Sequence, residues 1–219
     1  MFQETLSQLL ESTFATIYMV AVSGLVAFFI GLPIAIGLTV TAKGMFYENI
    51  VVHKILSSFV TIGRSVPFVI LMVAIIPFTR FVVGSSIGTA AAMVPLSVAA
   101  IPFFARIVEG KFASINSGLI EAAQAMGCSP FQIIYKVLLP EAVPGIANSC
   151  TILFVSLTEY SAMAGAVGGS GLGNMAIQYG YYQFNTPVML QALVVLVLLV
   201  LIIQFTGDYI TRKISHHSI

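Results

Sequence analysis

Five long apolar runs divide this chain and leave room for little else. They cover about residues 14–42, 55–79, 86–108, 143–164 and 187–207. A helix needs about 20 mostly apolar residues to cross the hydrocarbon core of a bilayer, and each run reaches that length. The runs take up most of the 219 residues, so no separate soluble domain fits beside them. The sequence therefore predicts an all-α integral membrane protein with five transmembrane helices in a single domain, residues 1–219.

The composition excludes several other classes of protein. Hydrophobic residues make up 58% of the chain and charged residues only 8%, whereas soluble domains carry roughly 25% charged residues. The net charge of +1 comes from scattered basic residues, which form no face that could follow a nucleic-acid backbone. Cys128 and Cys150 have neither metal-ligand spacing nor the framework of a secreted disulfide protein. We therefore expect a lipid bilayer as the surroundings, free thiols, no metal site and no nucleic acid partner.

The basic residues predict how the chain is oriented, because Lys and Arg gather on the cytoplasmic side of membrane proteins. With five spans, eight of the nine basic residues share one side: Lys43, Lys54, Arg64, Arg106, Lys111, Lys136, Arg212 and Lys213. Only Arg80 falls on the other side. The sequence therefore predicts an N-terminus outside, a C-terminus in the cytoplasm and a polar loop, residues 114–140, that faces the cytoplasm.

The first half of this polar loop has the pattern of a short helix that ends in a glycine turn. Leu119, Ala123 and Met126 recur at helical spacing and predict one apolar face. Gly127 follows at the place where a left-handed residue would cap the helix.

The second half of the loop begins with a capping signature. Ser129 supplies a hydroxyl cap, Pro130 suits the first helical position, and Gln132 completes a capping box. Pro140 is expected to end this second helix. Such a bent helix pair is a suitable docking element for a soluble partner, although a plain amphipathic connector between two spans gives the same apolar stripes.

The loop resembles the EAA loop of ABC-importer permeases, the inner-membrane components of binding-protein-dependent transport. The family pattern is Glu-Ala-Ala, three residues, Gly, nine residues, Ile, any residue and Leu-Pro. It is filled here by Glu121, Ala122, Ala123, Gly127, Val137, Leu139 and Pro140, with Val137 in place of Ile as the only departure. The resemblance implies that these residues couple the chain to an ATPase, with Glu121 as a charge at the docking surface and Gly127 as the turn.

The same resemblance implies a fold and a set of partners. Permeases of this family have the type I ABC importer fold, and two copies form a homodimer. Two ATP-binding subunits dock on the cytoplasmic side, and an extracytoplasmic binding protein delivers the substrate. Since the chain has no Walker A sequence, we expect a transport subunit rather than an enzyme, without a cofactor of its own because ATP is used by the partner.

Further stretches resemble the permeases that import D- and L-methionine. They are RSVPF at 64–68, IPFTR at 76–80, VGSSIG at 83–88, YSAM at 160–163 and QFTGDYI at 204–210. YSAM is similar to the gate of those permeases, which implies an outer gate at Tyr160, Ser161 and Met163. Glu159 departs from the pattern, since a small neutral residue is expected before the Tyr. The resemblance implies methionine uptake across the bacterial inner membrane, driven by ATP hydrolysis in another subunit.

Two charges fall within the apolar runs. Arg64 lies in the near half of the second run, and Glu159 lies in the outer half of the fourth. A charge inside a bilayer is costly unless it reaches the interface, pairs or lines a polar cavity. Arg64 therefore either extends to the cytoplasmic interface or serves a pore or subunit interface. Glu159 either meets water at the outer surface or has a functional role, with Arg80 as a candidate partner.

The Gly-rich segment 165–173 lacks the spacing and the surrounding strands of a phosphate-binding loop. It is expected to be a flexible turn or a re-entrant segment. Together with the aromatic run that follows, it offers a docking face for an external binding protein as an alternative.

Two other functions remain open on the sequence. One is a permease of the same type for another amino acid or small metabolite. The other is an ion-gradient carrier or channel that uses Arg64 and Glu159 as coupling charges. An intramembrane enzyme is disfavoured, because no catalytic constellation falls on a common site.

Overall fold

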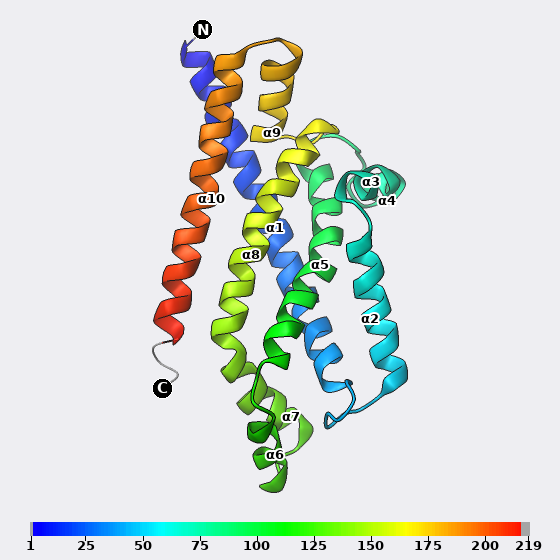
Figure 1. Ribbon diagram of the computed structural model, residues 1–219. Coiled ribbons are helices and arrows are strands. Elements are labelled where there is room, and N and C mark those ends of the chain that lie inside the picture. The colour runs from blue at the N-terminus through cyan, green and yellow to red at the C-terminus, as the bar shows by residue number, and fades with distance from the viewer. Residues whose placement is uncertain (1, 216–219) are drawn as a thin grey trace.

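The computed structural model describes residues 2–215, with side chains from Leu6 onward, and this part of the chain is helical without strands. The helices form an elongated bundle, with the N-terminus and the 114–140 loop at opposite ends (Figure 1). Four helices are long and apolar enough to cross a membrane: Leu6–Val40, Thr89–Ala113, Pro130–Ala166 and Thr186–Ser215. The bent pair Ile50–Ser65 and Phe68–Ala74 makes a fifth span if it is counted as one. The all-α membrane architecture is thus confirmed, with four or five spans.

The elements follow one another in a simple order. They are α1 (Phe2–Val40), α2 (Ile50–Ser65), α3 (Phe68–Ala74), α4 (Ile76–Val83), α5 (Thr89–Ala113), α6 (Ser117–Ala125), α7 (Pro130–Ile133), η1 (Ile134–Leu138), α8 (Leu139–Ala166), α9 (Leu172–Met175), η2 (Ala176–Tyr182) and α10 (Thr186–Ser215). The two η elements are π-helical. α1 crosses α5 and α8 obliquely, while α10 lies along α8 at the edge of the bundle (Figure 1).

The second apolar run, 55–79, does not form the single helix that the sequence predicts. α2 ends at Ser65, and α3 turns away from its axis by 100°. Pro67 explains the break, because a residue that precedes proline is pushed out of the helical region, and Val66 is extended with φ −84° and ψ 122°. α3 and α4 lie across the bundle and are seen almost end-on in Figure 1.

Glycines set how closely α1 approaches its neighbours. A Cβ at Gly24 would lie 2.4 Å from the ring of Phe154 on α8. A Cβ at Gly31 would lie 3.1 Å from the carbonyl oxygen of Ile101 on α5. Small residues at membrane-helix contacts let backbones pack this closely. The close contacts of α1 with α5 and α8 therefore depend on these two glycines.

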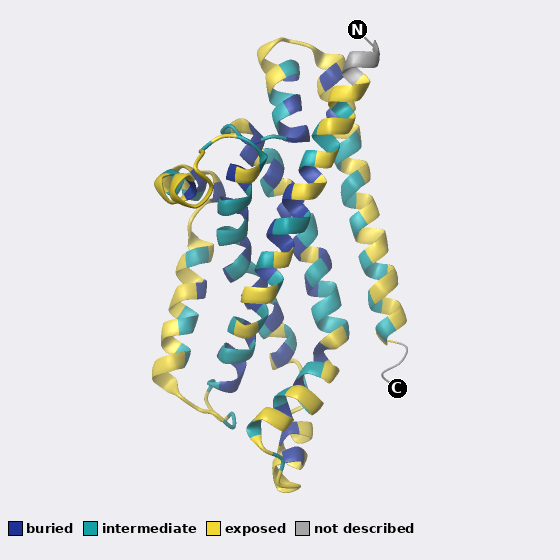
Figure 2. Ribbon diagram, turned by 180° about the vertical axis from the view of Figure 1, so that it is seen from behind, coloured by how far each residue is buried: buried dark blue, intermediate teal, exposed yellow. Residues whose placement is uncertain are grey.

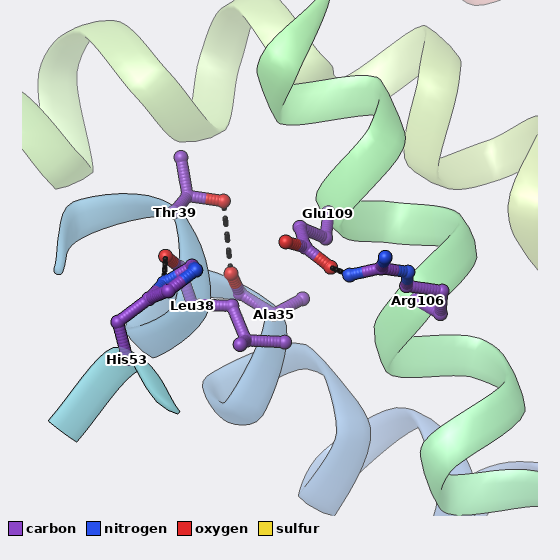
Figure 3. Close-up of polar contacts among 6 residues, drawn as sticks. All are labelled: Ala35, Leu38, Thr39, His53, Arg106 and Glu109. Atoms are coloured by element: carbon purple, nitrogen blue, oxygen red, sulfur yellow. Dashed lines mark hydrogen bonds and ion pairs between the residues drawn. The ribbon is translucent and has the colours of Figure 1, made fainter. Parts of the chain in front are cut away.

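His53 ties the start of α2 to the end of α1. Its Nδ1 lies 3.0 Å from the carbonyl oxygen of Leu38, and Figure 3 shows the contact. Since a carbonyl only accepts, Nδ1 carries the proton in this hydrogen bond. Thr39, next to Leu38, donates its hydroxyl to the carbonyl of Ala35 at 2.9 Å and so needs no partner outside its own helix.

Pro140 does not end a helix, contrary to the sequence prediction. The helix runs from Pro130 to Ala166 through the π-helical turn η1. Inside a regular α-helix, the proline ring would collide with the carbonyl four residues earlier. Just before Pro140 the turn is wider, since the N–H of Leu139 bonds to the carbonyl of Ile134, five residues earlier. The loop is therefore joined to α8 by one continuous helix.

The Gly-rich segment 165–173 is a buried turn between α8 and α9. Gly168 and Gly171 have φ of +94° and +97°, which side chains disfavour. The N–H of Leu172 donates to the hydroxyl of Thr16 on α1 at 2.9 Å. The segment packs against α1 and α8. It is therefore not the flexible turn that was one of the two expectations from the sequence.

Candidate functional site

The 114–140 loop has the helix, glycine turn and helix that the sequence predicts. Gly127 follows α6 with φ +77°. Its N–H donates to the carbonyl of Gln124 at 2.9 Å, and the N–H of Cys128 donates to the carbonyl of Ala123 at 3.1 Å. This is the paired hydrogen-bond pattern of a Schellman motif, which satisfies the last carbonyls of a helix.

The capping box after the turn is confirmed as well. The N–H of Ser129 donates to the side-chain oxygen of Gln132 at 2.8 Å, and the N–H of Gln132 donates to the Ser129 hydroxyl at 3.4 Å. Pro130 occupies the first turn of α7. Two caps back to back thus hold the loop in one bent shape.

Burial divides the loop residues differently from the predicted stripe. Ile120 and Ala123 are buried at the centre of the loop, while Leu119 and Met126 are exposed. In a helix of only nine residues, the hydrophobic spacing fits the predicted apolar face as well as the face that is actually buried. The packing of α6 against η1 decides which of the two faces is buried. Ala123, at 1% exposure, therefore supports the loop from inside and is not part of its outer surface.

The outer surface of the loop is apolar. Four large side chains lie on it with exposed fractions of 44 to 77%: Leu119, Met126, Phe131 and Tyr135. Glu121, Ala122 and Pro140 of the EAA pattern are exposed beside them, whereas Leu139 is half-buried. Figure 2 shows the loop at the foot of the bundle, with exposed turns over a few buried ones. An apolar patch of this kind on a polar loop is typical of a protein contact surface.

Replacement of Gly127 by Pro is expected to destroy the bent shape of the loop. Proline fixes φ near −65°, opposite in sign to the observed +77°, and it lacks the N–H that bonds to Gln124. We expect trypsin to cut at Lys136 at least about tenfold faster in the variant, because the opening of the loop would cost over 1 kcal/mol less. Cleavage of purified protein in detergent measures this, and an unchanged rate would contradict a role of Gly127 in loop shape.

The predicted gate residues lie near the other end of α8, but they do not share one surface. Ser161 is buried, and its hydroxyl donates to the carbonyl of Thr158 at 2.7 Å. The ring of Tyr160 stacks on Phe68 of α3, with centroids 4.9 Å apart and planes 8° apart. Met163 is exposed. Of the three, only Met163 is placed to meet another molecule, and Phe68 is a member of this cluster that sequence reasoning missed.

The two membrane-depth charges lie apart. Arg64 occupies the last turn of α2, far from the end of the bundle that carries the loop, and not near that end as the sequence suggested. Glu159 lines an apolar groove between α8 and α10. Neither Glu159 nor Arg80 on α4 has an ion-pair partner in the described part of the chain, so the structure does not bring this candidate pair together.

The site residues of the described chain form a binding surface at one end of the bundle and a separate cluster at the other. Within residues 2–215, no group of three His, Cys, Asp or Glu side chains is arranged to hold a metal ion. Cys128 and Cys150 are free and half-buried, one in the loop and one in α8. The exposed apolar surface of the loop is suited to binding a partner.

Sequence comparison finds relatives over almost the whole chain. The family described as binding-protein-dependent transport system inner membrane component matches residues 30–216. A Vibrio cholerae protein named probable D-methionine transport system permease protein MetI is 51% identical over 208 residues, which cover 95% of this chain and 92% of that protein. An Escherichia coli K12 protein named D-methionine transport system permease protein MetI is 51% identical over 157 residues, 72% of each chain.

Solved structures agree with these relatives. A chain from inward-facing conformations of the MetNI methionine ABC transporter superposes with a TM-score of 0.96 and 50% identity, covering 98% of this chain and 99% of that chain. A chain of an amino acid ABC transporter with histidines superposes with a TM-score of 0.74 but only 16% identity, over 99% of this chain and 96% of that chain. The second likeness is one of fold alone.

Proposed function

Because this chain belongs to the family of binding-protein-dependent transport system inner membrane components, we propose that it forms the translocation pathway of an ABC importer for D- and L-methionine. The observation that carries the proposal is the EAA-type loop, which presents an apolar surface and is built into the helix that bears Met163. The substrate is supported by the relatives of about half-identical sequence that are named as methionine permeases.

The continuous helix from Pro130 to Ala166 supports a direct mechanism of coupling. An ATPase that docks on Met126 and Phe131 moves the loop, and η1 and α8 pass this movement on because no flexible break separates them. ATP binding closes the ATPase pair, draws the two loops together and opens the outer gate at Met163 to the binding protein. The gate of a narrow pore closes when flexible apolar side chains such as Met exclude water.

The assembly in this proposal has two copies of the chain, two ATP-binding subunits and an extracytoplasmic methionine-binding protein. A single copy has four or five spans, too few to enclose a pathway, and two-fold symmetry doubles them. The chain itself holds no cofactor, because ATP is bound by the partner. The loop and the C-terminus face the cytoplasm, and the N-terminus is outside; the basic residues near the loop end of the bundle favour this orientation.

Reconstitution tests the proposed function. The protein is purified in mild detergent together with its ATPase, placed in liposomes with ATP inside, and given liganded binding protein and radiolabelled methionine outside. We expect uptake that requires ATP and is abolished when the ATPase is left out. If uptake is instead competed more strongly by another amino acid, the substrate assignment is wrong. If the chain alone moves solute under an imposed ion gradient, the carrier alternative replaces the proposal.

A further inference from the structure

A stripe of polar residues runs along α2. Lys54, Ser58, Thr61 and Ser65 follow one another at spacings of four, three and four residues, which place them on one side of a helix. All four are exposed in the protomer. Within the described residues, the Ser65 hydroxyl donates to the carbonyl of Thr61 at 2.8 Å, while Lys54 and the hydroxyls of Ser58 and Thr61 have no hydrogen-bond partner. Polar groups without partners are not expected to face lipid along a membrane span.

The other two sides of α2 have different surroundings. One side packs on α5, where Val60 is fully buried and a Cβ at Gly63 would lie 2.8 Å from the ring of Pro102. Another side exposes large apolar residues, including Ile55 and Ile62. The apolar side is suited to lipid, so the polar stripe is the side that is left for water.

Arg64 lies beside this stripe at its deep end. It is 14 residues beyond Ile50, a rise of about 21 Å along the helix, which is past the middle of a 30 Å hydrocarbon core. Side chains on a helix lean towards its N-terminus, so we expect the guanidinium of Arg64 to lie at the depth of the core and not at the nearer outer surface.

The guanidinium of Arg64 also has no partner. It is exposed and makes no ion pair or hydrogen bond with any described residue. Arg106 on α5 differs, since it pairs with Glu109 at 2.7 Å (Figure 3). An unpaired Arg at this depth is expected to face an aqueous path, where it attracts an anion.

The surroundings of Arg64 connect it to the predicted gate. Phe68, the first residue of α3 after the break at Pro67, stacks on Tyr160, which precedes Met163 by three residues on α8. The end of α2 also leaves backbone carbonyls without helical partners, as at any helix C-terminus, and such an end favours a cation. Arg64, which can donate hydrogen bonds to a carboxylate, and the carbonyl end of α2, which favours a cation, thus belong to the same helical turn.

We propose that Arg64 binds the carboxylate of the amino-acid substrate as it leaves the gate, while the carbonyl end of α2 faces its ammonium group. The polar stripe then leads from Arg64 to the cytoplasm. This inference rests on the proposed function, and it adds a specificity-determining residue to a path for which no substrate contact has been identified above.

The first test asks whether the stripe faces water. Single cysteines are placed at Ser58 and Thr61, with matched controls at Ile55 and Ile62, in a chain whose Cys128 and Cys150 are replaced by Ser. A charged, water-soluble thiol reagent is applied to the assembled complex in liposomes. We expect the two stripe positions to react at least about tenfold faster than the two controls. Equal rates on both sides of α2 would overturn the proposal.

The second test asks what Arg64 does. Arg64→Gln and Arg64→Lys are compared with Lys43→Gln, which removes a positive charge from the exposed turn between α1 and α2, outside the polar stripe. ATP hydrolysis stimulated by liganded binding protein and methionine uptake are measured on the same proteoliposomes. We expect Arg64→Gln to keep the stimulated hydrolysis and to lose roughly tenfold or more of the methionine moved per ATP, because a charged hydrogen bond is lost. Arg64→Lys should recover part of the loss, and Lys43→Gln should behave as the wild type.

Two results would overturn the role of Arg64. One is wild-type transport per ATP in Arg64→Gln. The other is an equal fall of hydrolysis and uptake in both Arg64 variants, which would show a structural role. If the wild-type complex itself fails to move methionine, the proposed function fails, and that outcome is distinct from both.

Discussion

Replacement of Met126 and Phe131 together by Asp is expected to release the partner ATPase from this protein and to reduce ATP-driven uptake more than about 100-fold. The two side chains have exposed fractions of 77 and 75% in the free chain, so the substitution does not disturb a core. Apolar anchors at the centre of a contact contribute about 2 kcal/mol or more each, and two such losses exceed a factor of 100 in affinity. A carboxylate buried in their place would add a desolvation cost.

The measurement is the amount of ATPase that co-purifies with the tagged protein in mild detergent. Tyr47→Asp is the matched control, because Tyr47 is an exposed aromatic residue at the same end of the bundle, in the turn between α1 and α2. We expect the control to retain the ATPase. Retention of the ATPase in equal amount by the double variant would show that the outer surface of the loop is not the docking surface.

Gly173→Ala is expected to lower the thermal stability of the protein by about 6–12 °C and to abolish uptake with it. A Cβ at Gly173 would lie 2.4 Å from both the Cα and the carbonyl oxygen of Ala162, next to Met163 on α8. Backbone atoms cannot move aside as a flexible side chain can. Overpacking of this kind costs up to about 3 kcal/mol, and each kcal/mol corresponds to about 2–4 °C in a chain of this length.

Thermal unfolding in detergent, followed by intrinsic tyrosine fluorescence, measures the effect. Gly110→Ala is the matched control, since Gly110 lies in helix α5 and the added Cβ would meet nothing within 4 Å beyond the backbone of its own helix. Alanine is the better helix former, so the control should be as stable as the wild type or slightly more stable. An unfolding temperature of Gly173→Ala that equals that of the control would contradict the tight contact between α8 and α9.

Much of the 114–140 loop could be predicted from the sequence, because its determinants are local. The left-handed turn after α6 favours glycine, which is present as Gly127. Ser129 and Gln132 form a capping box within four residues of chain. Such signals depend on hydrogen bonds between neighbours, and they hold whatever the loop packs against. The roles of Tyr160, Ser161 and Met163 came from a resemblance, and their separate environments were not visible in it.

The sequence by itself determined that the chain is a helical membrane protein with a bent polar loop at one end. Length and apolarity of the runs suffice for this, since a bilayer leaves a backbone few ways to satisfy its polar groups. Only the tertiary structure decided that α2 breaks at Pro67, that the helix continues through Pro140, and that Arg64 is left unpaired at depth beside a polar stripe. Both prolines are visible in the sequence, but whether a proline breaks a helix or is accommodated by a wider turn depends on the backbone around it. Whether Arg64 finds a partner depends on the packing of segments far apart in the chain.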